Sequence, residues 1–597
     1  MAGRNGKSGG SFNNKLWVRA MCVFLGVLMM LAIVFMVISA FSPDSYAETE
    51  ETGEKKTSAN REIGVGLCCA QSAAQSLTLK CSEGFVISAG GFSRPVTDQT
   101  LTVSADGNEY YYNKRITVNP KNDDGEPDDT KGVLLVGGYH IMISGYGVGS
   151  GDIDHDNPVY IEREQSGDQS IYYKITKEYI FEHIDNFRAA ASKINELPST
   201  VLEDVFPGCI GGKYYIMAGA FRNAEEAHQA LGILCAQLTL EASVAVPDPG
   251  TVTVHNERNV ILFETDSKDP LTLVSPDGAY IAAGGKMYKG CFEFCRDNTT
   301  GDTLKVVNRL DIEDYVKSRL SAEVPETASA EMLKAAAVII RTNACVFLGK
   351  HGSDGFDVCA SCHCAVYTGC GGYSDTDSVS NAVDSTAGVV LTYSDTPINA
   401  LWSTSCMSTT VSAADAIGRD IPYLRSLLTN WEMEEDKVLE DWTFEISPSD
   451  LSLMLRGAGY SQITGSIKNV TVDKRSENSL YVCEMTFTDI FGNAAKITGS
   501  ENIRSLFCGD LPSSAFIVSK TGKPVTFTYY AEGGVTSEIT RTPEGTPGFF
   551  VFSGEGEGSG IGFSMTGAEI LAKQGYSFDR ILSEYYPGTA LSYAGQF

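Results

Sequence analysis

The sequence predicts an α+β protein built from mixed, largely antiparallel sheet with a few helices, placed after an N-terminal transmembrane helix. Short β-like runs broken by Gly recur from residue 62 onward, whereas helical periodicity is confined to a few segments. A charge-free apolar run near the N-terminus supplies the predicted membrane segment.

Length and charge narrow the class of protein. The chain has 597 residues, too many for one hydrophobic core, so several domains are expected. Its formal charge is −29, from 46 basic and 75 acidic residues. This balance argues against a nucleic-acid-binding protein, which would need a basic surface, and against adhesion to anionic lipid or anionic wall polymers.

Residues 20–42 form the predicted anchor. They carry no charge, and at 1.5 Å per residue they are long enough to cross a bilayer. The basic tail 1–19 and the acidic stalk 43–61 place the tail in the cytoplasm and the bulk of the chain outside, facing the cell wall. Ser45-Tyr46-Ala47 also resembles a cleavage site, so a cleaved signal peptide and a secreted protein are the alternative.

Residues 62–250 are expected to form an N-terminal α/β region. Within it, a strand at 213–221 ends in a G-x-F turn, and a helix opens with N-x-E-E-A at residue 223 before another β-like run at 243–246. Over residues 207–246 this order resembles the start of the SPOR domain, a small peptidoglycan-binding module. An ordinary βα unit is the alternative.

The Pro-Asp-Pro-Gly linker at 247–250 marks the start of a second predicted domain, residues 251–597. Its expected elements are strands at 260–264, 271–274, 280–283 and 304–308, a helix at 330–350, strands within 380–430 and 442–530, and helices at 448–457 and 568–574.

Glu323 is the predicted centre of the chemistry. Because Pro325 biases Val324 away from helical geometry, the sequence predicts that Glu323 lies on an extended turn just before an alanine-rich helix. Such a carboxyl group could act as acid or base in a cleft, or it could simply cap the following helix.

Three segments then occur in order. The first runs from Asp314-Tyr315 through Glu323-Val324-Pro325 to Arg341-Thr342, the second is FDVCASCHCAVYTG at 356–369, and the third is GEGEGSGIGFS at 554–564, followed by YYPGT at 585–589. Together, over residues 255–591, they resemble the stage II sporulation protein D (SpoIID/LytB) family.

The resemblance implies a membrane-anchored lytic transglycosylase. Such an enzyme cleaves peptidoglycan glycan strands between N-acetylmuramic acid and N-acetylglucosamine, leaving 1,6-anhydromuramic ends, in sporulation or cell-wall remodelling. Glu323 matches the family's single acid/base. One carboxyl group suffices because the sugar's own C6 hydroxyl replaces the water of ordinary hydrolases. Its pKa would need to be raised, most simply by apolar surroundings.

Substrate contacts are expected from polar and aromatic residues near the cleft. Arg341 could instead form a buried structural ion pair, and the aromatic residues could belong to the core. The proposed contacts are Arg341, Tyr367, Ser405, Tyr423 and Ser559.

The chain departs from the family pattern at several supporting positions. Val324 replaces Met, Ser559 replaces the His of G-H-G, and residues 405–410 read SCMSTT instead of S-G-G-x-T. The alternative function is therefore a catalytically impaired peptidoglycan-binding protein, or an enhancer of a partner amidase.

A structural zinc site is the expected cofactor site. The sixteen cysteines of an exported chain could form disulfides, but the tightest cluster also has soft ligands suited to tetrahedral zinc. Family members bind zinc here with two Cys and two His. Cys362 leaves a Cys3His set open, and a disulfide within the cluster is the alternative. The expected ligands are His351, Cys359, His363 and Cys364.

Overall fold

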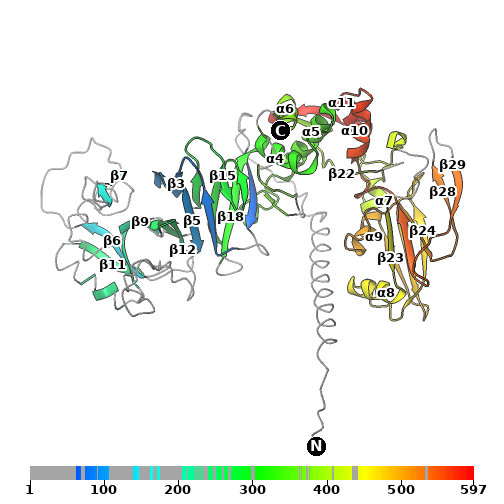
Figure 1. Ribbon diagram of the computed structural model, residues 1–597, viewed down its shortest axis with the longest axis horizontal. Coiled ribbons are helices and arrows are strands. Elements are labelled where there is room, and N and C mark those ends of the chain that lie inside the picture. Colours follow the sequence, from blue (N-terminus) through cyan, green and yellow to red (C-terminus); the bar gives the residue numbers. More distant parts are fainter. Residues whose placement is uncertain are drawn as a thin grey trace, which may run out of the picture. The chain divides into compact units, whose positions relative to one another are not determined.

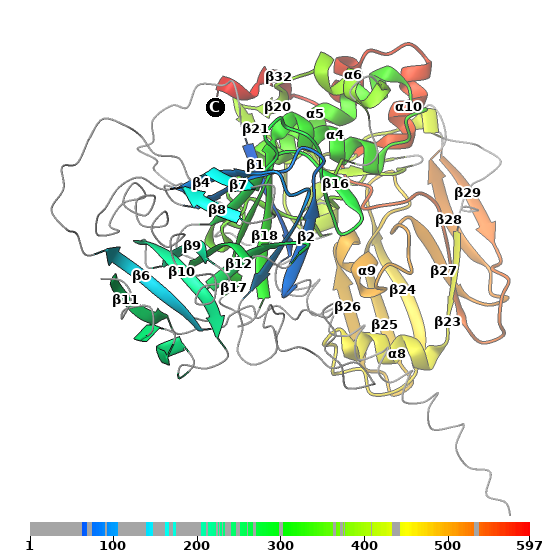
Figure 2. The ribbon, with the colours of Figure 1, turned by 60° about the vertical axis from the view of Figure 1, so that its left-hand side comes forward.

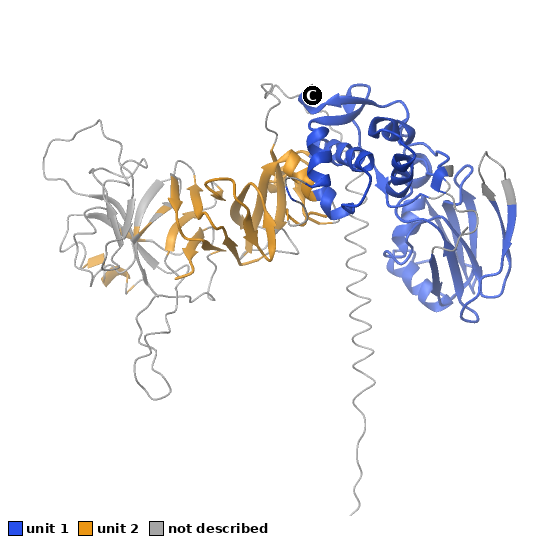
Figure 3. Cartoon of the chain, turned by 45° about the horizontal axis from the view of Figure 1, so that its top comes forward, with its two compact units in different colours: residues 1–59, 319–347, 373–597 blue, residues 60–318, 348–372 orange. Residues whose placement is uncertain are grey.

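The computed structural model divides the chain into two compact units, coloured separately in Figure 3. The N-terminal unit comprises residues 60–318 and 348–372, and the C-terminal unit contains residues 319–347 and 373–597. The structure describes residues 62–68, 74–89, 92–105, 139–146, 162–165, 171–174, 205–210, 213–221, 225, 227–229, 231–232, 240–245, 251–258, 261–266, 270–297, 303–361, 364, 366–370, 374, 377–406, 409–432, 442–530 and 536–596.

A seven-stranded sheet of the N-terminal unit includes Cys359, one of the expected zinc ligands. Its neighbouring strands are antiparallel except for β1 and β19, which are parallel. Alternating buried and partly buried side chains in β18 and β3 explain why these segments form strands with one face in the core. The strand order is β19 (Val358–Cys359), β1 (Glu62–Cys68), β18 (Thr303–Asp311), β17 (Cys291–Asp297), β14 (Leu271–Val274), β3 (Phe85–Ala89) and β4 (Phe92–Val96).

The N-terminal unit also contains a ten-stranded sheet (Figure 1) and a hairpin of β7 (Glu162–Gln165) and β8 (Ile171–Lys174). The order in the large sheet is β11 (Leu240–Ala245), β6 (Tyr139–Tyr146), β10 (Lys213–Phe221), β9 (Val205–Ile210), β13 (Ile261–Asp266), β12 (Thr251–Asn256), β5 (Thr100–Ala105), β2 (Ser76–Lys80), β15 (Ile281–Ala283) and β16 (Lys286–Tyr288).

In the C-terminal unit, one group of helices lies together at one end, and two three-stranded sheets with further helices beside them form the other (Figure 2). The helical end holds α5 (Ala330–Phe347), α6 (Ser378–Ser385), α10 (Met565–Lys573) and α11 (Phe578–Tyr585), with the sheet of β21 (Thr396–Pro397), β20 (Val389–Tyr393) and β32 (Ala590–Tyr593).

Two carboxylates fix the starts of these helices. Glu569 of α10 accepts hydrogen bonds from the backbone N–H and the hydroxyl of Ser329, at 2.8 and 2.9 Å, just before α5 begins. Glu331 of α5 in turn accepts from the backbone N–H of Phe578, the first residue of α11, at 2.8 Å. Both contacts satisfy amide groups that a helix N-terminus leaves without an intrahelical partner.

The second half of the C-terminal unit has its own hydrophobic core, formed among others by Leu451, Phe487 and Phe552. The helices are α7 (Ala413–Ile417), α8 (Pro448–Gly457) and α9 (Ser500–Leu506). The strands are β22 (Trp402–Ser403) with β31 (Phe563–Ser564), β23 (Trp442–Ile446) with β30 (Phe550–Gly554) and β27 (Phe516–Lys520), β24 (Ile467–Arg475) with β25 (Val482–Asp489) and β26 (Ala494–Thr498), and β28 (Val525–Tyr530) with β29 (Thr536–Arg541).

The α+β prediction is confirmed. The helix expected at 448–457 and the strand expected at 271–274 occur with those limits. The boundary expected at residue 250 does not coincide with a boundary between units, because β12 and β13 pair with strands on either side of it in sequence.

None of the described helices is long and apolar enough to span a membrane. The predicted tail, anchor and stalk, residues 1–61, lie outside the described residues, as does the linker at 247–250. In the SPOR-like segment, β10 and β11 bracket helical residues at 225, 227–229 and 231–232. This order also fits an ordinary βα unit, so the SPOR resemblance stays a prediction.

Candidate functional site

Glu323 is the last residue of helix α4 (Ile312–Glu323), so the prediction of an extended turn is wrong. Asp311 begins this helix by accepting from the backbone N–H of Glu313 at 2.8 Å, and the N–H of Val324 closes it with a bond to the carbonyl of Leu320 at 2.9 Å. Pro325 restricts only the residue before it, so it ends the helix after Glu323 instead of unwinding it earlier. Glu323 does not cap α5, since Ser329 and Glu569 occupy that place.

Arg319, one turn earlier on α4, is the partner of Glu323, and the sequence analysis missed it. Its Nε lies 3.1 Å from Oε1 of Glu323, and its Nη2 forms an ion pair with the same oxygen. The two side chains are only 11% and 21% exposed. An Arg four residues before a Glu on one helix is a common surface pair, so only the burial distinguishes this one.

The pKa of Glu323 is raised. Burial is the largest cause, because it disfavours the charged form, and the positive charge and hydrogen bonds of Arg319 oppose it. The position at the C-terminal end of α4 acts in the same direction as burial, because the helix dipole is negative there. Of the predicted apolar neighbours only Val324 is buried, whereas Ala322 and Pro325 are exposed. A raised pKa suits a carboxyl group that must donate a proton near neutral pH.

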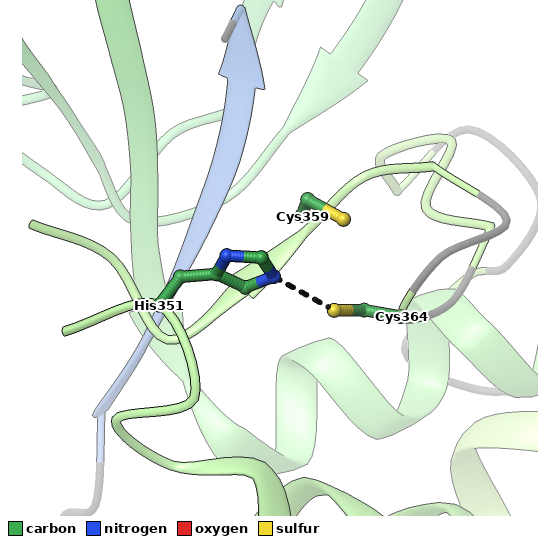
Figure 4. Close-up of side chains that lie close together, drawn as sticks. All are labelled: His351, Cys359 and Cys364. Carbon is green, nitrogen blue, oxygen red and sulfur yellow. Dashed lines mark hydrogen bonds between the residues drawn. The ribbon is translucent and has the colours of Figure 1, made fainter. Parts of the chain in front are cut away.

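A second candidate site lies in the N-terminal unit, where the structure brings together three of the four expected zinc ligands (Figure 4). One ligand atom from each of His351, Cys359 and Cys364 lies within 4.8 Å of the others. Nε2 of His351 is 3.2 Å from Sγ of Cys364. No disulfide joins the ten cysteines whose side chains the structure describes.

The chemistry of this cluster fits a metal cation. The hydrogen bond with Cys359 and burial raise the pKa of the Cys364 thiol. Two thiolates this close would repel each other, and a cation between them would offset that repulsion. Nδ1 of His351 faces a carboxylate oxygen of Asp354 at 3.4 Å, which leaves Nε2 directed toward the thiols. A metal-bound His commonly has such a partner on its other nitrogen.

Strand β1 supports the metal cluster from far away in sequence. Gly66 pairs in parallel with Cys359, and the backbone N–H of Gly64 donates to Oδ2 of Asp357 at 2.7 Å. Phe356 stacks on the ring of His351 with centroids 5.0 Å apart, and it contacts the strand at Gly66, where an added Cβ would lie 2.9 Å from ring carbons. His363 and Cys362 lie outside the described residues, so the fourth ligand stays a prediction.

Two other predicted residues, Ser405 and Ser559, lie in one polar neighbourhood of the C-terminal unit. Ser405 exchanges two backbone hydrogen bonds with Glu557, each 3.1 Å long, and Oγ of Ser559 is 3.2 Å from Oγ of Ser403. The carboxylate of Glu432, 5% exposed, accepts from the hydroxyl of Ser405 at 3.3 Å.

Glu432 is the residue that sequence reasoning missed in this neighbourhood. It also accepts from the backbone N–H of Cys406 at 3.1 Å and from the hydroxyl of Tyr585 at 3.3 Å. In the sequence it opens an acidic run that looks like a solvated linker, and the only signal of burial is the preceding Trp431. Its charge contributes to raising the pKa of the buried Cys406 thiol, after burial itself.

The structure contradicts two predicted substrate contacts. Arg341 is 0% exposed, and its guanidinium donates to the backbone carbonyls of Val389 and Val383 at 3.1 and 3.3 Å. Tyr367 is 3% exposed, and its hydroxyl donates to Asn308 at 2.7 Å. Both side chains stabilise the interior, because buried polar groups take internal hydrogen-bond partners, and neither can touch a glycan in this conformation.

The predicted contact between Tyr423 and the substrate is compatible with the structure. It is partly exposed, and its ring lies 5.6 Å from that of Tyr393, measured between centroids. A partly exposed aromatic pair is able to stack on a sugar ring, so a contact between Tyr423 and substrate stays a prediction.

Comparison with known proteins shows a similarity over part of the chain. A family model described as "Stage II sporulation protein" (SpoIID) matches residues 300–393, a segment that contains Glu323, His351 and Cys359. The similarity to this family is therefore located in a SpoIID domain at residues 300–393 of the chain.

Individual relatives are more distant. The stage II sporulation protein D of Bacillus subtilis (strain 168) is 26% identical over 304 residues, covering 49% of this chain and 77% of that protein. The amidase enhancer of the same strain is 27% identical over 307 residues, covering 46% of this chain and 40% of that protein. An uncharacterized protein of Brachyspira hyodysenteriae (strain ATCC 49526 / WA1) is 26% identical over 322 residues, covering 54% of this chain and 76% of that protein.

Proposed function

We propose that this protein is a lytic transglycosylase that cleaves peptidoglycan glycan strands between N-acetylmuramic acid and N-acetylglucosamine, with Glu323 as its acid and base. The observation that carries the proposal is the half-buried Glu323 carboxyl group, with its raised pKa, inside the segment that matches the SpoIID family. The similarity to a stage II sporulation protein D supports a role in sporulation or cell-wall remodelling.

The chemistry needs one carboxyl group used twice. Protonated Glu323 gives its proton to the glycosidic oxygen as the bond from that oxygen to C1 of muramic acid breaks, and the electron pair of that bond stays on the oxygen. The Glu323 carboxylate then takes the proton of the C6 hydroxyl of the same sugar while that oxygen bonds to C1. The 1,6-anhydro ring closes without water, and Glu323 returns to its protonated form.

Zinc is proposed as a structural cofactor held by His351, Cys359 and Cys364, with His363 as the fourth ligand. The fit of the three described ligands supports this proposal. A metal there would tie His351 and Cys364, on either side of strand β19 in sequence, to Cys359 in that strand. No proton transfer in the proposed reaction is assigned to it.

The proposed location rests on the sequence alone. We propose that residues 20–42 anchor the protein in the cell membrane, with the bulk of the chain facing the wall, or that the protein is secreted if this segment is cleaved. The membrane, the glycan strands and a wall amidase are the proposed partners.

The test is digestion of purified glycan strands by the full chain. Mass spectrometry should detect 1,6-anhydromuramic ends with the wild type and lose them with Glu323→Gln, which keeps the shape but cannot exchange the proton. Glu326→Gln, an exposed carboxylate three residues along, is the matched control and should keep activity. Absence of anhydro ends with the wild type, or their persistence with Glu323→Gln, would refute the proposal.

A second candidate function is binding of peptidoglycan without cleavage, in support of a partner amidase. The similarity to the amidase enhancer of Bacillus subtilis favours it, as does the burial of Arg341 and Tyr367, which leaves fewer side chains to hold a sugar in place. This function predicts co-sedimentation with glycan strands, unchanged by Glu323→Gln, with no release of product.

A further inference from the structure

Among the described helical ion pairs of the C-terminal unit, where Arg504–Glu501 of α9 has side chains 30% and 16% exposed, the contact between Arg319 and Glu323 is the most shielded overall. Its side chains are 11% and 21% exposed, whereas those of Arg580–Glu584 on α11 are 58% and 39% exposed and their charged atoms are 3.9 Å apart. Exposed pairs of this spacing contribute little to stability. A shielded pair interacts more strongly, because less water screens the charges.

The contact is also one-sided. Nε and Nη2 of Arg319 both donate to Oε1 of Glu323. No described residue donates to Oε2, and Oε2 is not among the buried polar atoms that lack a partner, so solvent or a ligand reaches it. One oxygen of the carboxyl group is therefore held, and the other is open.

We propose that Arg319 is the positioning residue of this site: it holds Oε1 of Glu323 and leaves Oε2 as the atom that gives and takes the proton. This inference rests on the proposed function. In the first step the proton leaves Oε2 for the glycosidic oxygen, and in the second Oε2 receives the proton of the C6 hydroxyl, so the carboxyl group ends as it began.

The charge of Arg319 has a defined effect on these steps. It stabilises the carboxylate that forms when the proton leaves, which makes Glu323 a stronger acid than burial alone would leave it. Arg319 is the one described charged side chain that acts on this carboxyl group. A stronger acid protonates the leaving oxygen faster, but it also loses its proton at lower pH.

The experiment compares pH–rate profiles of the full chain for wild type, Arg319→Met, Arg319→Lys and the control Arg580→Met, with release of anhydro ends as the readout. For Arg319→Met we expect the plateau rate to fall by about tenfold, since Glu323 becomes a weaker acid, while the alkaline limb moves to higher pH. Arg319→Lys keeps the charge without the planar fork, so its alkaline limb should stay nearer that of wild type. Arg580→Met should match wild type.

A second measurement does not require turnover. The full chain is labelled with ¹³C at the glutamate carboxyl carbons, and the Glu323 signal is assigned by its loss in Glu323→Gln. Its titration midpoint should move to higher pH in Arg319→Met and stay in place in Arg580→Met.

The two measurements separate the two proposals. A wild type that releases no anhydro ends refutes the proposed function, while the titration still decides whether Arg319 controls the protonation of Glu323. A lowered rate with neither the alkaline limb nor the titration midpoint displaced would mean that Arg319 only stabilises α4, and the inference would be overturned.

Discussion

Nε2 of His351 lies 3.2 Å from Sγ of Cys364, although strand β19 lies between the two residues in the sequence. If this contact marks a structural zinc site, the purified full chain should contain about one zinc ion. Cys364→Ser and His351→Ala should lose most of it, and their unfolding temperature should fall, because binding free energy of a structural metal is folding free energy. Elemental analysis and thermal unfolding are the measurements. Cys508→Ser, an exposed cysteine outside the cluster, should keep full metal content.

Gly66→Ala should weaken the same cluster without touching a ligand. The new Cβ would lie 2.9 Å from three ring carbons of Phe356, which stacks on His351. Overpacking of this kind costs about 1–3 kcal/mol, and moving the ring would displace the imidazole. We expect lower stability together with weaker metal retention in a chelator competition. Gly352→Ala, in the same loop but with no atom within 4 Å of the new Cβ, should retain metal as the wild type does.

The stability of the protein should depend on the protonation of Glu323. Burial raises the pKa of this carboxyl group in the folded state, so the folded protein binds the proton more tightly than the unfolded chain does. This contribution to stability is complete below the unfolded pKa and is lost as the pH rises through the folded pKa. Glu323→Gln should therefore become more stable than wild type, in urea unfolding, at pH values above that window. Equal pH slopes for the two proteins would contradict the assignment, and Glu326→Gln should follow wild type.

Glu569→Ala should destabilise the helical end of the C-terminal unit. It removes the acceptor of both the backbone N–H and the hydroxyl of Ser329, at the start of α5. Loss of such a cap typically costs about 1 kcal/mol, measurable as a lower urea midpoint. Lys573→Ala removes only the 69% exposed partner of Glu569 and should cost much less. Similar losses in both variants would show that the charge pair matters more than the cap.

Tyr367→Phe separates a structural role from substrate binding. The variant loses the buried hydrogen bond to Asn308 and should be less stable by about 1–2 kcal/mol. The KM for glycan strands should stay unchanged, because the ring is 3% exposed. A raised KM with unchanged stability would restore Tyr367 to the substrate-binding residues.

Short sequence patterns were sufficient to predict some of the helices. The Ser447-Pro448 start of α8 and the alanine-rich run of α5 combine a cap or a strong helix former with apolar spacing, and both helices were predicted. The soft ligands of the Cys/His segment and the family resemblance together predicted a zinc site, and the ligand atoms of His351, Cys359 and Cys364 do lie within 4.8 Å of one another.

The surroundings of the site residues could not be predicted, because they depend on contacts between residues distant in sequence. The sequence around Glu323 shows the proline that ends α4 but not the helix itself, whose pattern of charged residues hides its buried side. Glu432 looks like part of a solvated acidic run, and only the folded chain places it against Cys406 and Tyr585. Arg341 and Tyr367 were misjudged because burial of a polar side chain depends on partners distant in sequence.

The pairing of β1 with β18 and β19 bears on how this protein should be produced. Residues 62–68 lie between the two strands, and Gly64 bonds to Asp357, 293 positions further along the chain. A recombinant fragment cut at residue 251, as the linker suggests, would leave the edge of β18 open and Cys359 without its neighbouring strand. Unpaired strand edges favour aggregation, so such a fragment is a poor choice for crystallisation or assay. Expression should instead begin upstream of residue 62.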